Sequence, residues 1–157
     1  MKKFAILLFL GACMAACGGN SDKNSATSET STDSKGENGN PSYDPERGEG
    51  KFKEVTVGAT VDQAMADAGG KIYSVKCNAC HKLTGEKLVG PGWLGVTARH
   101  KAPWIMNFVT NTDAMLNKDP KAQAQLEICL VRMPNQNVAD DEARNIYEFM
   151  RRNDGVK

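Results

Sequence analysis

The string Cys77-Asn-Ala-Cys80-His81 constrains this chain more than any other feature of its sequence. Cysteines three residues apart on one helical turn point the same way, and a histidine follows the second cysteine at once. Three kinds of site use such a string: a redox-active dithiol, half of a zinc site, or the covalent attachment of a haem. The surrounding sequence has to distinguish them.

The N-terminus has the pattern of an export signal. Lys2 and Lys3 precede a short apolar run, residues 4–10, which is too short to span a bilayer. A cysteine after small residues follows, and this resembles the lipobox of bacterial lipoproteins, in which the cysteine is lipidated. Cys17 is the preferred candidate, Cys13 is the alternative, and a cleaved signal without lipid is the remaining option. We therefore expect an exported protein that is lipid-anchored to a bacterial membrane and faces the periplasm.

Composition divides the chain into three parts. Residues 1–16 are the expected signal peptide, and residues 17–50 combine the lipidated cysteine with a Gly/Ser/Thr-rich linker. Such a linker cannot bury enough apolar surface to fold, so we expect it to be disordered. Residues 51–157 carry the apolar periodicity of a folded domain. The net charge of +1 gives no indication of nucleic-acid binding.

Helical periodicity without a convincing strand pair predicts an all-α domain of about four short helices. A capping box of Thr60 and Gln63 opens the first helix. Pro103 suits the first turn of the second, Asp119 caps the third, and acidic residues from Asp140 begin the last. The expected apolar face of the first helix is Val61, Met65, Ala68, Ile72 and Val75.

A haem site needs the fewest additional residues and explains the most features of the sequence. A thioredoxin-like dithiol needs an alternating β/α pattern, which is missing. A zinc site needs four ligands, and the domain adds only Cys129 and His100. Two cysteines on one turn can add to the two vinyl groups of one haem, with His81 beneath the iron. Covalent attachment also keeps a cofactor bound outside the cell. Cys129 is then a lone thiol, expected as a small buried hydrophobe.

Residues 61–152 resemble the class I cytochromes c. The resemblance rests on the haem-attachment string and on the segments VGPGWLGV and MPNQNVADDEARNIYEFMR. It also rests on Gly69 and Tyr73 upstream of the string, which in the family pack on a C-terminal helix, here on Ile146 and Phe149. The resemblance implies a cytochrome c fold around one covalently attached haem c. It also implies that the Pro91 carbonyl accepts a hydrogen bond from the axial histidine, and that Met133 is the second axial ligand.

Other residues compete for the second ligand position. Met106 and Met150 fall on apolar helical faces, where a core role is expected, and Met115 lies in a loop-like piece. His100 stands between two basic residues and is expected at the surface. Met133 is preferred, and a site without a sixth protein ligand remains an alternative.

His/Met ligation leaves no open coordination position, so the expected function is single-electron transfer and not catalysis. The expected partners are a respiratory donor complex and a terminal oxidase or reductase. A haem domain with an open iron, peroxidase-like or gas-sensing, is one alternative, and a fixed electron-entry subunit of a larger reductase is another. Basic residues near the motif are candidates for steering acidic partners, with an ordinary solvated face as the alternative. They are Lys76, Lys82, Lys87, Arg99 and Lys101.

Overall fold

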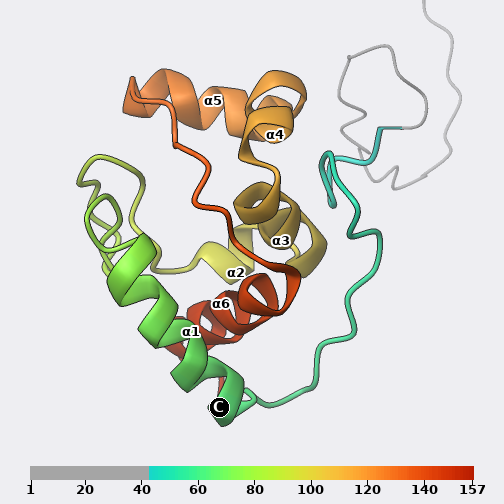
Figure 1. Cartoon of the computed structure of the whole chain (residues 1–157), viewed down its shortest axis with the longest axis vertical. Helices are drawn as coiled ribbons and strands as arrows, with labels where there is room; N and C mark the ends of the chain where they lie inside the picture. The colour runs from blue at the N-terminus through green and yellow to red at the C-terminus, as the bar shows by residue number, and fades with distance from the viewer. Residues whose placement is uncertain (1–42) are drawn as a thin grey trace, which may run out of the picture. The chain divides into compact units, whose positions relative to one another are not determined.

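The computed structural model describes residues 43–157, and this part of the chain contains helices and no β-strand (Figure 1). The expected all-α class is confirmed, with six helices in place of about four. They are α1 (Gln63–Lys76), α2 (Val96–Arg99), α3 (Ala102–Thr110), α4 (Thr112–Lys118), α5 (Pro120–Cys129) and α6 (Asp140–Asn153). None of the described helices is long and apolar enough to cross a membrane.

The crossing of α1 and α6 is the main helix contact of the domain (Figure 1). At the crossing, a Cβ atom added to Gly69 would lie 2.6 Å from the carbonyl carbon of Asn145 and 2.8 Å from Cβ of Phe149. Only glycine allows this approach. Ile146 is fully buried beside it, and the rings of Tyr73 and Phe149 lie 5.4 Å apart. The helix pairing implied by the resemblance is confirmed, and it holds α1 just before Cys77.

The start and the buried face of α1 differ from the expectation. Asp62, not Thr60, caps the helix, because its carboxylate accepts a hydrogen bond from the Met65 N–H at 3.0 Å. The buried residues of the helix are Ala66 and Gly69. Close helix contact selects small residues for that face, and bulkier apolar side chains are displaced to its flanks. Val75, expected on the apolar face, is 82% exposed.

Residues 43–50 were expected to be linker but pack onto the domain as the first part of an N-terminal strap, residues 43–57. The buried side chain of Asn107 holds the strap, donating to the Arg47 and Phe52 carbonyls and accepting from the Phe52 N–H. Gly48 packs directly on the side chain of Met115. The composition argument missed the strap because glycines and backbone hydrogen bonds attach it. Cys13, Cys17 and residues 1–42 lie outside the described residues.

Helices α3 and α5 begin where the sequence predicts. Pro103 lies in the first turn of α3, and the Asp119 carboxylate accepts from the Ala122 N–H at 2.7 Å. Helix α4 was not expected, because its N-cap, Asn111, makes no side-chain cap hydrogen bond and its start carries no local signal. Met115, predicted in a loop, is fully buried on α4. Helix α6 has Ala139 as its N-cap and keeps only the Glu142 half of a capping box, 3.0 Å from the Ala139 N–H.

Candidate functional site

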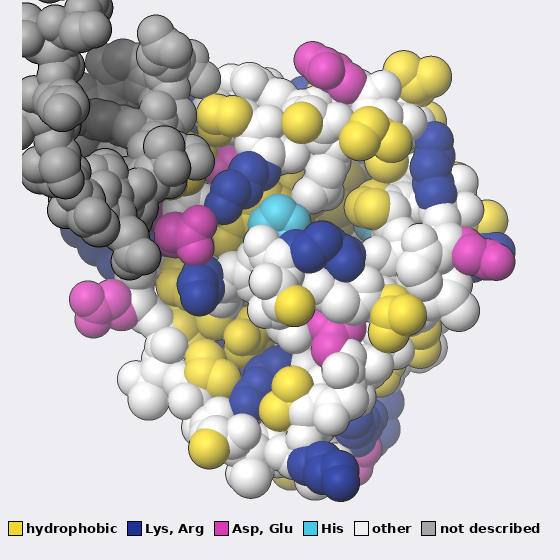
Figure 2. All heavy atoms as spheres, turned by 180° about the vertical axis from the view of Figure 1, so that it is seen from behind, with side chains coloured by type: hydrophobic (Ala, Val, Ile, Leu, Met, Phe, Trp, Pro, Cys, Tyr) yellow, Lys and Arg dark blue, Asp and Glu magenta, His cyan; other side chains and the backbone are white. Residues whose placement is uncertain are grey.

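A cavity of about 470 Å³ opens between the segment that follows α1 and helices α3, α5 and α6. Figure 2 shows a histidine at the bottom of this hollow, bordered by hydrophobic and basic side chains. The volume falls within the range of cofactor sites, and a mostly apolar wall is typical of them. The large apolar and aromatic residues of the wall include Trp93, Trp104, Ile105, Phe108, Leu116 and Leu126.

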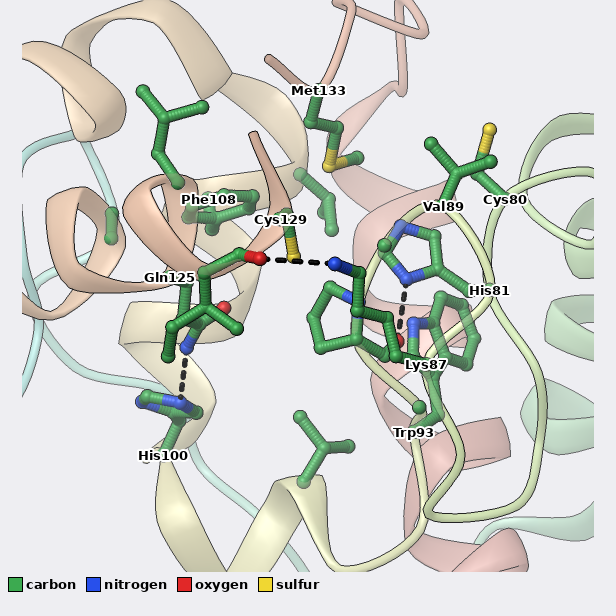
Figure 3. A pocket seen from close by; sticks show the side chains of 18 of the residues that line it. Cys80, His81, Lys87, Val89, Trp93, His100, Phe108, Gln125, Cys129 and Met133 are labelled. Atoms are coloured by element: carbon green, nitrogen blue, oxygen red, sulfur yellow. Dashed lines mark hydrogen bonds between the residues drawn. The ribbon is translucent and has the colours of Figure 1, made fainter. Parts of the chain in front are cut away.

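His81 lies in the cavity wall directly after α1, held by its own N–H, which donates to the Cys77 carbonyl at 3.0 Å. Nδ1 of its ring lies 2.8 Å from the Pro91 carbonyl oxygen (Figure 3). A carbonyl only accepts, so Nδ1 carries the proton and Nε2 keeps a free lone pair. Burial lowers the pKa of His81, and the bond to Pro91 offsets part of this effect. The ring is therefore neutral and has the tautomer that a metal ligand needs.

Gly90, the residue before Pro91, also packs closely on the His81 ring. A Cβ atom added to Gly90 would lie 2.8 Å from Nδ1 and 2.9 Å from Nε2 of the imidazole. Tyr73 donates from its hydroxyl to the His81 carbonyl at 2.7 Å, which links the ligand segment to the helix crossing. The imidazole orientation is thus set by the backbone of Gly90 and Pro91. The hydrogen bond expected between Pro91 and His81 is confirmed.

The two cysteines of the string lie on one turn, because the Cys80 N–H donates to the Cys77 carbonyl at 3.1 Å. Cys80 lines the cavity, whereas Cys77 is buried at the end of α1. Both are free thiols. Burial raises the pKa of Cys77 to about 11, although Lys76 acts in the opposite direction. A redox dithiol needs a lowered thiol pKa, so the structure disfavours that alternative.

No group of three or more His, Cys, Asp or Glu side chains within residues 43–157 is arranged to hold a metal ion. The zinc alternative, which needed Cys129 and His100 as further ligands, therefore has no support in the described part of the chain. Both residues do line the cavity. Cys129 is half-buried there, less enclosed than expected for a core thiol.

Met133 lines the cavity from the segment that follows α5 and lies near His81 in the close view (Figure 3). Met150 also lines it, from the core of α6, where it is 3% exposed. Met106 and Met115 are buried elsewhere and are not part of the wall. Only Met133 and Met150 among the competing methionines therefore face the space beside His81, and only Met133 lies outside a helix.

His100 is buried, contrary to the expectation of a surface residue. Its ring stacks on Trp104 with centroids 3.8 Å apart, and its Nε2 lies 3.1 Å from the amide nitrogen of Gln125 (Figure 3). Desolvation by burial, with smaller contributions from nearby Lys121 and Arg99, lowers the pKa of His100 to about 4. The sequence did not predict this burial, because the residues on either side of His100, Arg99 and Lys101, are charged. Because Nε2 is engaged by Gln125, His100 is a poor candidate for an iron ligand.

The family model described as Cytochrome c matches residues 66–154, more than half of the chain. The chain belongs to the cytochrome c family. Cytochrome c domains bind haem c covalently and use it for electron transfer, so this protein carries haem c and takes part in haem-based electron transfer. No curated protein matches the sequence significantly.

Solved structures of cytochromes c have the same fold. The cytochrome c from Rhodothermus marinus is 30% identical, with a TM-score of 0.65, over 67% of this chain and 90% of that one. An engineered form of the same protein is 28% identical, with a TM-score of 0.64 over the same shares. A further engineered form, described as bound to a carbene intermediate, is 28% identical with a TM-score of 0.61, again over those shares.

The residues around the cavity of this cytochrome c fit a covalent haem. Free thiols are what thioether formation consumes, and the string supplies two of them on one turn. A neutral imidazole with a free Nε2 is the form in which histidine binds iron. The apolar wall suits the flat face of the macrocycle. Cys80 and His81 thus lie on the cavity wall, and Cys77 lies on the same turn just before them.

The basic residues near the haem string are less available than their sequence positions indicate. Lys76 pairs with Glu142 at 2.8 Å, and Lys82 pairs with Glu86 at 2.8 Å. Lys87 donates to the Ile128 carbonyl at 3.0 Å, across the cavity opening (Figure 3). Lys101 is exposed. Three of the four lysines proposed for partner docking are therefore engaged within the chain.

Proposed function

We propose that this cytochrome c is a single-electron carrier and not an enzyme, with one haem held by Cys77 and Cys80. In this proposal His81 and Met133 are the axial ligands and Pro91 orients His81. The observation that carries it is the hydrogen bond from His81 Nδ1 to the Pro91 carbonyl, 2.8 Å long, which leaves Nε2 free in the cavity that Met133 also lines.

When bound, the haem supplies a one-electron ferric/ferrous couple. The residues of the chain then tune and protect that couple. A thioether sulfur from Met133 favours the ferrous form more than a second imidazole does, and so raises the reduction potential. The hydrogen bond to Pro91 keeps His81 fixed in both oxidation states. A ligand on each side leaves no position for oxygen or peroxide, which is why we propose electron transfer and not bond-making chemistry.

The cellular setting is also part of the proposal. The N-terminal pattern supports export and a lipid anchor on Cys17, or on Cys13, in a bacterial membrane that faces the periplasm. The partners would be a respiratory donor complex and a terminal oxidase or reductase. Lys76, Lys82, Lys87 and Lys101 are the candidate docking residues from the sequence.

The optical spectrum tests the proposed ligation against an open iron site. We expect a weak Met–iron band in the ferric protein, which disappears in Met133→Ala together with a fall in the reduction potential. Met150→Leu is the matched control, because Met150 also lines the cavity, and we expect it to keep both the band and the potential. An unchanged spectrum and potential in Met133→Ala would show that the carrier mechanism is wrong as stated.

A further inference from the structure

Met133 lies in a stretch of chain that we call the ligand arm, residues 131–138, between the end of α5 and the start of α6. Among the described residues, the backbone of the arm makes no hydrogen bond to other backbone groups. Val138, at the far end of the arm, is its one buried residue. Segments with few buried contacts and few backbone hydrogen bonds open most readily. The arm therefore depends on side-chain contacts to keep Met133 at the cavity.

The backbone at the two ends of the arm has left-handed conformations. Leu130, the C-cap of α5, has a φ of 61°, and Asn137 has a φ of 49°. Asparagine tolerates this region, but leucine is unfavourable in it. The path of the arm is thus imposed by its contacts with the rest of the domain and not by local backbone preference.

Arg132, the residue before Met133, makes the main polar contact between the arm and the domain. Its Nη2 lies 3.1 Å from Oδ1 of Asp113 and 3.0 Å from Oδ1 of Asn117, and its Nε lies 3.3 Å from the same Asp113 oxygen. A further hydrogen bond from Nη2 reaches the Asp113 backbone carbonyl at 3.4 Å. The guanidinium makes these bonds together because its N–H donors have a fixed planar arrangement. We call this set of contacts the Arg132 clamp.

Only one other described residue outside the arm reaches it by a hydrogen bond. Lys76 donates to the Asn137 carbonyl at 3.4 Å, a longer contact that lies beyond Met133 along the chain, and Lys76 also pairs with Glu142. On the side where the arm leaves α5, the Arg132 clamp is therefore the hydrogen-bonded attachment that precedes Met133.

Helix α4 is a firm platform for the clamp. Asp113 and Asn117 are four positions apart, so they lie on the same face of the helix. The opposite side of α4 is anchored in the core, since Thr112 and Met115 are fully buried and Leu116 forms part of the cavity wall. A contact to α4 thus fixes the arm relative to the cavity.

The exposure of the clamp decides what it can do. The Arg132 and Asp113 side chains are 43% and 67% exposed, and such a pair contributes little to the stability of a whole domain. The arm, however, can open locally without unfolding the domain. For that smaller step few other contacts oppose the opening, so the clamp is a large share of what holds Met133 in place.

We propose that Arg132 is a positioning residue for the axial methionine, because its contacts with Asp113 and Asn117 hold the ligand arm on α4 and so keep Met133 on the iron. The inference rests on the proposed ligation by His81 and Met133. When the clamp opens, the arm moves away from the cavity, and the coordination position of Met133 becomes accessible to an external ligand. The clamp thereby keeps the site closed and suited to electron transfer.

Cyanide binding to the ferric, haem-loaded protein measures how often Met133 leaves the iron. Cyanide enters only after the methionine departs, so at saturating cyanide the observed rate equals the departure rate. We expect this rate to be about two- to fivefold higher in Arg132→Gln than in the wild type, from the usual strength of an exposed ion pair. Without cyanide, the Met–iron band and the denaturant midpoint should not change. A saturating rate equal to that of the wild type would overturn the proposal.

A double-mutant cycle separates the clamp from a direct effect of Arg132, which itself borders the cavity. Asp113 does not line the cavity, and Asp113→Asn should raise the rate to a similar extent. The double variant Arg132→Gln/Asp113→Asn should be no faster than Arg132→Gln alone, whereas independent, multiplying effects would contradict the clamp. Lys118→Gln is the matched control on α4, because Lys118 pairs with Glu49 of the strap at 3.2 Å, and it should keep the wild-type rate. An equal increase in Lys118→Gln would also overturn the proposal.

Met133→Ala distinguishes failure of the clamp from failure of the proposed ligation. With no methionine to displace, cyanide binding should be fast and should rise with cyanide concentration without saturating. A wild-type rate in Met133→Ala would refute the ligation and the clamp together. Fast binding in Met133→Ala combined with a wild-type rate in Arg132→Gln would refute the clamp alone.

Discussion

Replacing Gly69 by alanine should weaken the domain at the helix crossing that positions the haem string. The added Cβ would lie 2.6 Å from the Asn145 carbonyl carbon and closer still to its oxygen, whereas ordinary contact begins at 3.4 Å, so α1 and α6 must separate by at least about 0.8 Å. A gap of that size forfeits a quarter to a half of the dispersion energy of each contact at the crossing. The clash is with backbone, so we assign a cost of about 3–4 kcal/mol, at the upper end for overpacking.

Helix propensity opposes this loss. Alanine is better than glycine inside a helix by about 1 kcal/mol, so the net loss in the free energy of unfolding should be about 2–3 kcal/mol. Gly70→Ala is the matched control on the same helix. There the new Cβ would meet only the movable side chains of Phe149, at 3.2 Å, and Arg152, at 3.7 Å. We expect that variant to be as stable as the wild type or up to about 1 kcal/mol more stable.

Denaturant unfolding of the haem-loaded protein, followed by far-ultraviolet circular dichroism, measures both variants. The expected result is a lower midpoint for Gly69→Ala with an unchanged slope, and no decrease for Gly70→Ala. Equal stabilities of Gly69→Ala and Gly70→Ala would refute the claim that close backbone contact, and not side-chain packing in general, sets this crossing.

Three further predictions concern the site and the strap. Gly90→Ala should displace the His81 ring, because the new Cβ would lie within 2.8 Å of it, and should therefore lower haem incorporation or the reduction potential. Gly85→Ala is the control, since a Cβ there has no atom within 4 Å, and it should change neither quantity. Optical spectra and redox titrations measure both variants. Asn107→Ala should lower the free energy of unfolding in denaturant by about 2–4 kcal/mol, because three hydrogen bonds to the strap backbone are lost. Limited proteolysis should then cut the strap, and protection equal to that of the wild type would contradict this prediction. His100 has an ordinary pKa of 6.5 and a folded pKa of about 4, so the unfolded chain binds the proton first as pH falls, and stability should drop between pH 6.5 and 4 by up to about 3 kcal/mol. His100→Phe should flatten that part of the stability curve, and an unchanged curve would show that His100 is not the group responsible.

The sequence predicts the parts of the fold that depend on local chemistry. Asp119 and Pro103 predict helix starts, because an N-cap and a first-turn proline depend only on the residues of the same helical turn. The contact between His81 and Pro91 was implied by resemblance, since the string and the segment VGPGWLGV occur together. Gly69 could be paired with α6 for the same reason, although the sequence alone does not show why the position must be glycine.

Features that depend on distant contacts could not be predicted. The first part of the strap, residues 43–50, is held through Asn107, which lies sixty positions after Arg47, and nothing in the composition of those residues marks them as folded. His100 is buried against Trp104 and Gln125 despite charged neighbours. The sequence shows the lysines near the string, but the groups that engage Lys76 and Lys87, the Glu142 carboxylate and the Ile128 carbonyl, come from distant segments and could not be predicted.

Proton NMR of the reduced protein tests the central claim of His81/Met133 ligation most directly. A methionine methyl group bound to ferrous iron lies over the haem ring, and its resonance is shifted far upfield by the ring current. We predict one such three-proton signal, absent in Met133→Leu and retained in Met150→Leu. A signal that persists in Met133→Leu, or no upfield methyl signal in the wild type, would contradict the account.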